Sequence, residues 1–151
     1  MAVDDTFPGR FAHARQRGQA VVELALVAPV LLLLCFGVLG VGRVTQAHMA
    51  ARAVAWEAAR AAAVAPSAAG AAQRGVAMGL AVADAYRLRR SALQLTVDAS
   101  DFRRGGQVRA DARYTVSLAD LPLLGWAATT VDSVHTEPID PYRAGLGGSA
   151  S

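Results

Sequence analysis

The fold of this chain is determined first by residues 15–41, which read RQRGQAVVELALVAPVLLLLCFGVLGV. Residues 24–41 carry no charge, and extending this run back to Ala20 gives 22 residues interrupted only by Glu23. At about 1.5 Å of rise per residue, a helix of this length spans roughly 33 Å, enough to cross a bilayer core of about 30 Å. Lipid offers no partners for free backbone groups, so we predict a membrane-spanning α-helix. Pro29 has no N–H to donate, and a mild kink is expected there.

The same apolar run also indicates whether the chain is retained in the membrane, and the residues beside it indicate the orientation of the chain. It is longer than the apolar region of a cleaved secretory signal, which is about 7 to 15 residues. We therefore favour a retained membrane segment, with a secreted protein carrying an unusually long signal as a lesser alternative. Arg15 and Arg17 lie closest to one end of the segment, which favours a cytoplasmic N-terminus.

Composition sets the broad class. The 151 residues leave room for one modest domain beside the membrane segment. All 15 basic residues are arginine, and the net charge is +3. These arginines are scattered and mixed with aspartates, so we do not expect nucleic-acid binding. The single cysteine, Cys35, lies in the apolar run and has no second cysteine with which to form a disulfide within the chain.

The rest of the chain predicts a small α+β domain that begins with helices. Alanine and other helix formers extend the first helix to about Val64, and Pro66 then marks a stop. A second helix is expected at residues 71–89. We expect its core-facing residues to be Val76, Leu80 and Ala83.

After the second helix the hydrophobic period changes from 3.6 to 2. Apolar and polar residues alternate over residues 93–97 and again over 108–118, with a Gly-rich turn at 103–106, so the two runs predict an antiparallel hairpin. A third strand is expected at about 129–136. From Pro138 onward the chain reads as loop and then disorder.

These elements divide the chain into four expected parts. They are a cytoplasmic leader, a membrane helix with its extension, a small soluble α+β domain and a disordered tail, at residues 1–18, 19–65, 66–137 and 138–151.

A carboxylate at the start of the membrane helix is unusual. Gly18 ends a basic, polar leader, and Glu23 follows five residues later. A carboxylate in a membrane helix costs about 2.5–3.5 kcal/mol at the centre and less near an end, so such residues usually have a partner. No basic residue lies one helical turn away on the membrane side. Either Glu23 awaits a partner from another chain, or it is an interfacial carboxylate that reaches water.

Gly, four residues and Glu at the opening of an apolar helix resemble the processing site of type IV pilins and pseudopilins. A closer resemblance, over about residues 17–65, is to the TadE-like branch of tight-adherence (Tad) pilus systems. It rests on GQAVVELALVAPVLLLL, then GVGRV, then AARAVAWEAARAAA. The resemblance implies that a prepilin peptidase cuts between Gly18 and Gln19. It also implies that Glu23 pairs in the membrane with the free N-terminal amine of a neighbouring subunit.

The function implied by this resemblance is that of a minor pseudopilin or assembly component of a Tad pilus or related type II-like secretion apparatus. Its partners would be the lipid bilayer, the prepilin peptidase, other pilin or pseudopilin subunits and assembly-platform proteins, and its small sheet domain would be pilin-like and lie outside. The alternative is an uncleaved single-pass anchor for a small outward-facing binding or scaffold domain.

Catalytic chemistry is not expected. His13, His48 and His135 are far apart, and none has metal-ligand spacing with a cysteine or a carboxylate pair. The Gly-rich stretches lack the form of a phosphate loop, and the serines lack a nucleophile-elbow context. We expect no metal, no cofactor and no enzyme activity.

Overall fold

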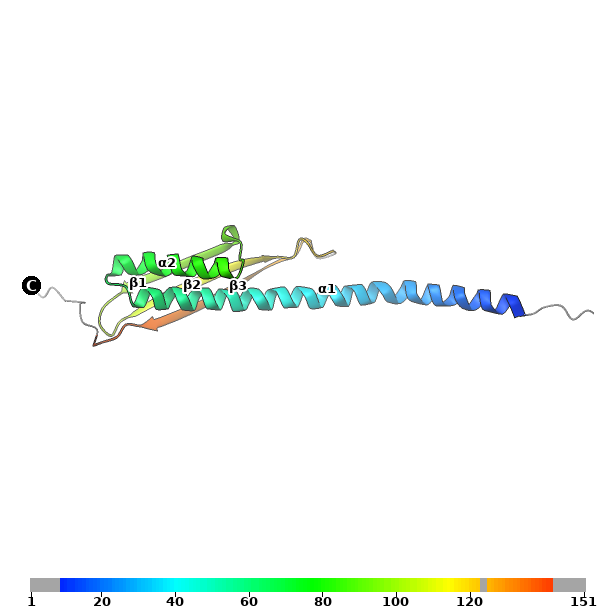
Figure 1. Ribbon diagram of the computed structural model, residues 1–151, viewed down its shortest axis with the longest axis horizontal. Coiled ribbons are helices and arrows are strands. Elements are labelled where there is room, and N and C mark those ends of the chain that lie inside the picture. Colours follow the sequence, from blue (N-terminus) through cyan, green and yellow to red (C-terminus); the bar gives the residue numbers. More distant parts are fainter. Residues whose placement is uncertain (1–8, 123–124, 143–151) are drawn as a thin grey trace, which may run out of the picture. The chain divides into compact units, whose positions relative to one another are not determined.

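The computed structural model describes residues 9–122 and 125–142, and for residues 9–18 it describes the backbone only. The helices are α1 (Gly9–Ala63), α2 (Ala68–Ala85) and a short 3-10 helix, η1 (Arg90–Ala92). The strands are β1 (Leu93–Asp101), β2 (Gln107–Ser117) and β3 (Ala128–Pro138). The predicted α+β class, with a long first helix, a second helix and a three-stranded antiparallel sheet, is therefore confirmed (Figure 1). The chain separates after Leu39 into two units.

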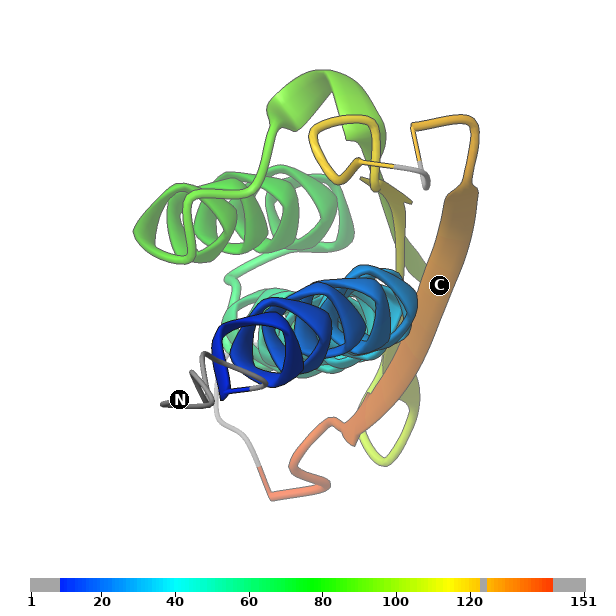
Figure 2. The ribbon, with the colours of Figure 1, turned by 90° about the vertical axis from the view of Figure 1, so that its right-hand side faces the viewer.

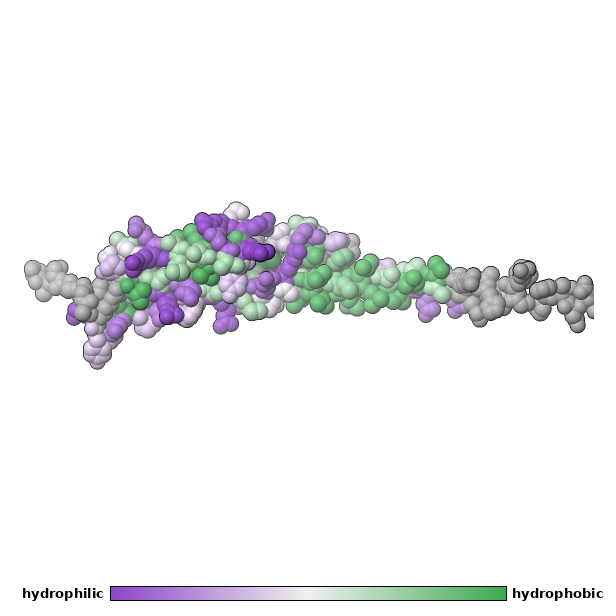
Figure 3. Space-filling view, in the orientation of Figure 1, coloured by the Kyte–Doolittle hydropathy of each residue, from purple (hydrophilic) through white to green (hydrophobic). Residues whose placement is uncertain are grey.

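In the first unit, α1 carries the apolar run with its side chains exposed (Figure 3). Only 6% of the most apolar 18-residue stretch of this helix is buried. The core helix of a soluble protein would be mostly buried, because water disfavours exposed apolar surface. Within the part of the chain that the structure describes, α1 alone is long and apolar enough to cross a membrane, which supports a single-pass membrane protein.

In the second unit, the strands form one sheet in the order β1-β2-β3, with both pairs antiparallel. The α1 segment after Gly40 and α2 lie against the same face of this sheet (Figure 2). The alternation predicted for β2 is confirmed, since every second residue is buried against the helices and the residues between them are mostly exposed. The buried residues are Val108, Ala110, Ala112, Tyr114 and Val116.

The core between α1 and the sheet is built from small side chains. Ala51, Ala55, Ala58 and Ala62 of α1 are each 0% exposed. They pack with β2 residues that include Ala110 and with Leu95 and Val97 of β1. Alanine on both surfaces lets the helix and sheet backbones approach closely, and it retains high helix propensity in α1.

The core face of α2 differs from the prediction. Its buried residues are Ala71, Gly75, Gly79 and Ala83, whereas Val76 and Leu80 are only partly buried. The expectation for Ala83 was correct, and that for the two larger residues was wrong. The physical reason is the close approach of α2 to α1: a Cβ at Gly75 would lie 2.8 Å from the carbonyl oxygen of Ala58.

The second helix also ends four residues before its predicted end at 89, at Ala85. Arg87 adopts a left-handed conformation with φ 55°. Its N–H donates to the carbonyl of Asp84, and the N–H of Leu88 donates to the carbonyl of Ala83. These bonds form a Schellman motif, which satisfies the last helical carbonyls and stops the helix. The residue in the left-handed position is usually glycine, so the sequence carried no stop signal here.

The start of α2 is capped by Ser67, whose side chain accepts a hydrogen bond of 3.2 Å from the N–H of Gly70. We expect Ser67→Ala to lower the free energy of unfolding by about 1 kcal/mol, because one of the first helical N–H groups loses its partner. Thermal unfolding of the full chain in detergent, followed by near-UV circular dichroism, measures this. Ser67→Asp, which restores a capping oxygen, should unfold like the parent; equal losses in both variants would argue against the cap.

The hairpin prediction is confirmed, with Gly105 at φ +69° in the turn. β3 extends slightly beyond the predicted 129–136 at both ends. Past residue 137 the chain is still ordered, because Ile139 is 1% exposed in the core and its N–H donates to the carbonyl of Gly106 at 2.8 Å. The expected loop at Pro138 therefore begins later. Residues 143–151 of the expected tail, like residues 1–8 of the leader, lie outside the described residues.

Candidate functional site at the start of the membrane helix

The bond predicted to be cut, between Gly18 and Gln19, lies inside α1. The helix begins at Gly9, so nine helical residues precede Gly18. Proteolysis of this bond requires the helix to open locally. Glycine lowers the cost of opening, because it is about 1 kcal/mol less favourable than alanine inside a helix.

Gln19 and Glu23 lie on one face of α1. They are four residues apart in a continuous helix, about 6 Å along its axis, and both side chains are exposed. Helical side chains lean toward the N-terminus, so the carboxylate of Glu23 covers the turn that starts near Gln19. Among the ion pairs within the described residues, none involves Glu23. Glu23, which has no ion-pair partner among the side chains that the structure describes, therefore lies beside the position where cleavage would create an amine.

Pro29 is exposed and lies six residues beyond Glu23 in the same helix. α1 continues past it as one helix. The kink proposed at this position stays a prediction.

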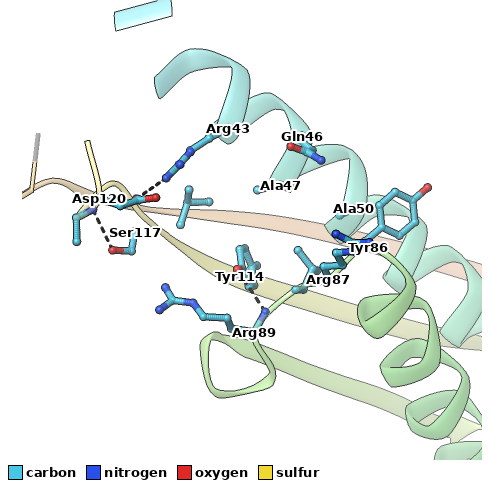
Figure 4. Close-up of a pocket in the computed structure, with 13 residues that line it drawn as sticks. Arg43, Gln46, Ala47, Ala50, Tyr86, Arg87, Arg89, Tyr114, Ser117 and Asp120 are labelled. Carbon is cyan, nitrogen blue, oxygen red and sulfur yellow. Dashed lines mark hydrogen bonds and ion pairs between the residues drawn. The ribbon is translucent and has the colours of Figure 1, made fainter. Parts of the chain in front are cut away.

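A second feature, which was not predicted from the sequence, is a pocket of about 570 Å³ in the soluble unit (Figure 4). Three segments line it: the α1 turn at Arg43, the connector after α2, and the end of β2 with the loop that follows. Three of its lining residues are basic, namely Arg43, Arg87 and Arg89, and Asp120 is its acid. The run RLRR at 87–90 was the sequence signal, but its approach to Arg43 depends on the fold.

Asp120 joins the loop after β2 to α1. The guanidinium of Arg43 donates a hydrogen bond to its carboxylate and forms an ion pair with it (Figure 4). This bond lowers the pKa of the Asp120 carboxyl, with help from the charges of Arg43 and Arg89. Because an aspartate has an ordinary pKa of about 3.9, Asp120 is ionised at neutral pH and offsets part of the basic charge.

The two histidines whose side chains the structure describes, His48 and His135, lie on different elements. His48 lies on α1, and Nε2 of His135 on β3 lies 3.1 Å from Oε2 of Glu137. His13 has no described side chain. Across residues 9–122 and 125–142, no group of three or more His, Cys, Asp and Glu side chains is placed to hold a metal ion.

Comparison with known proteins identifies the N-terminal part of the chain. No curated protein and no solved structure matches it significantly. Residues 18–60 match the family model described as TadE-like protein, a match that links the chain to Tad pilus assembly. Residues 18–60, which cover the apolar run and most of its alanine-rich extension, are therefore similar to TadE-like proteins, as the sequence predicted.

Proposed function

We propose that this protein is a minor pseudopilin or assembly component of a Tad pilus or related type II-like secretion apparatus, and that a prepilin peptidase cuts it after Gly18. The observation that supports this most directly is the TadE-like match, which begins at Gly18 and covers the helix that follows. Pilus-related proteins of this kind are generally structural, so the proposed role is assembly rather than catalysis.

The proposed orientation places the N-terminus in the cytoplasm and the sheet domain outside. Arg15 and Arg17 precede the apolar run, and Arg43 is the first cation after it. The support for this orientation is that Arg15 and Arg17 are the two arginines closest to one end of the apolar run.

In the proposed mechanism, cleavage creates an ammonium group at Gln19 and exposes it at the membrane boundary. A carboxylate and an ammonium are each costly to bury in lipid, and they attract strongly where the dielectric constant is low. Glu23 of one subunit then pairs with the amine of its neighbour and sets the axial offset between adjacent helices. Within one subunit the same two groups are about one helical turn apart, so pairing inside the chain competes with pairing between chains.

The cleavage is tested by mass spectrometry of the protein extracted from membranes of a host that contains the peptidase. We expect the mature chain to begin at Gln19. Gly18→Leu should leave nearly all of the protein uncut, because the large side chain opposes both helix opening and close approach of the peptidase. Gly37→Leu is the matched control: it lies in the same helix, and a Cβ there would meet nothing within 4 Å.

An intact leader in the parent protein would contradict this proposal. The alternative, an uncleaved single-pass anchor for an outward-facing domain, would then account for the chain. The continuous helix across the Gly18–Gln19 bond favours that alternative, since it shields the bond from a protease.

A further inference from the structure

The pocket at Arg43 lies where the chain leaves the membrane, a position fixed by covalent connectivity. Arg43 is two residues beyond Val41, the last residue of the uncharged run. Two residues of helix advance the chain by about 3 Å, so Arg43 lies at the level of lipid head groups. Arg43 takes this position if α1 crosses a membrane, whether or not the chain is cleaved at Gly18.

Two other segments bring more basic charge to this level. The Schellman motif at the end of α2 holds Arg87 on the pocket wall. The N–H of Arg89 lies 3.5 Å from the hydroxyl oxygen of Tyr114, which is 9% exposed in the core, so Arg89 is held beside the end of β2. With Arg43 and Asp120, the pocket carries three positive charges and one negative charge.

The loop after β2 adds an exposed aromatic residue. Asp120 ties this loop to Arg43, and the N–H of Leu118 donates to the carbonyl of Ala127 at 3.1 Å. Trp126 directly precedes Ala127, and it is 87% exposed. Tryptophan is enriched at membrane–water boundaries, where its ring is in the apolar region and its N–H remains near water.

We propose that this pocket binds the phosphate of an anionic phospholipid head group through Arg43, Arg87 and Arg89, with Trp126 in the adjacent boundary layer. Arginine suits this ligand because its planar, permanently charged group donates two parallel hydrogen bonds to phosphate oxygens. The occupant is a lipid because the chain itself places the pocket beside the bilayer, and the excess of positive charge complements an anionic head group. The bound lipid would fix the soluble domain relative to the membrane surface.

The test is native mass spectrometry of the full chain in detergent with added phosphatidylglycerol or phosphatidylcholine. We expect phosphatidylglycerol to bind more tightly. The double variant Arg87→Gln/Arg89→Gln should weaken its binding about 30-fold, which is about 2 kcal/mol, since each basic residue near an anionic surface contributes about 1 kcal/mol. Circular dichroism of the double variant confirms that it is folded.

Arg103→Gln/Arg104→Gln is the matched control. It removes the same charge from exposed positions at the hairpin turn, at the other end of β2 and roughly 33 Å from the pocket. This variant should bind phosphatidylglycerol like the parent. Equal weakening in both double variants, or equal binding of the two lipids by the parent, would overturn the proposal.

Two further readouts separate the lipid from other anions. Inorganic phosphate that displaces phosphatidylglycerol at similar concentration would point to a free-phosphate site and overturn the lipid assignment. In nanodiscs, with Trp56→Phe to leave Trp126 as the reporter, brominated phosphatidylglycerol should quench the fluorescence of Trp126. Absence of quenching would show that this residue lies away from the bilayer.

Discussion

Gly75→Val is expected to lower the free energy of unfolding of the soluble domain by about 3 kcal/mol, at the upper end of the usual cost of overpacking. A Cβ at this position would lie 2.8 Å from the backbone oxygen of Ala58 and 3.1 Å from Cγ1 of Val97. Backbone cannot rotate away as a side chain can. α2 must therefore move off α1, and the packing of both helices on the sheet is lost.

The measurement is thermal unfolding of the full chain in detergent, followed by near-UV circular dichroism, and the midpoint should fall by roughly 10 °C or more. The control is Ala77→Val, which places the same β-branched residue at an exposed position of α2 and should change stability by about 0.5 kcal/mol or less. Similar midpoints for the two variants would show that the contact at Gly75 does not limit the packing.

The neighbouring glycine should be more tolerant. A Cβ at Gly79 would lie 2.4 Å from Cδ2 of Leu95, which is the end of a flexible side chain. Rotation of Leu95 relieves this contact, so Gly79→Ala should lower the unfolding midpoint less than Gly75→Ala, whose Cβ meets the backbone oxygen of Ala58. Thermal unfolding of these two variants distinguishes a backbone contact from a side-chain contact.

Glu23→Gln is expected to reduce assembly with neighbouring subunits about 100-fold. Removing one member of a buried ion pair costs about 3–5 kcal/mol, because the other charge is left without a partner in lipid. The lower end applies here, since an α-amino group with an ordinary pKa of about 7.7–8.0 loses its proton readily. This expected loss of assembly rests on the proposed function. It also requires that Glu23 can reach a neighbouring subunit, and the side chain of Glu23 is exposed.

Cross-linking of the membrane-embedded chain to pilus subunits, quantified by mass spectrometry, measures this loss. Glu57→Gln is the matched control, because it makes the same acid-to-amide change on α1 beyond the membrane segment. Processing at Gly18 should be normal in both variants, which separates assembly from cleavage. If Glu23→Gln cross-links to pilus subunits as well as the parent does, the carboxylate of Glu23 is not needed for assembly.

Several features were predictable because they depend on local composition and period. The uncharged run of residues 24–41 required a helix of membrane length. Alternation in β2 placed its apolar residues on one face, since side chains along a strand point to opposite sides. The spacing of Gly18 and Glu23 resembled the processing site of type IV pilins. The longer pattern over about residues 17–65 resembled the TadE-like family, whose model then matched residues 18–60.

Other features needed the tertiary structure, because they depend on how closely distant segments approach. Hydrophobicity favoured Val76 and Leu80 as the core residues of α2, but the narrow space beside α1 admits only glycine and alanine there. Arg87 ends the helix without a recognisable stop residue. Arg43, Arg89 and Asp120 are separated by dozens of residues in the chain, and only packing of both helices on the sheet brings them together. Sequence alone determined which stretch is long and apolar enough to cross a membrane and which face of β2 is buried. The steric fit between the helices and the charge of the pocket were decided by contacts between remote segments.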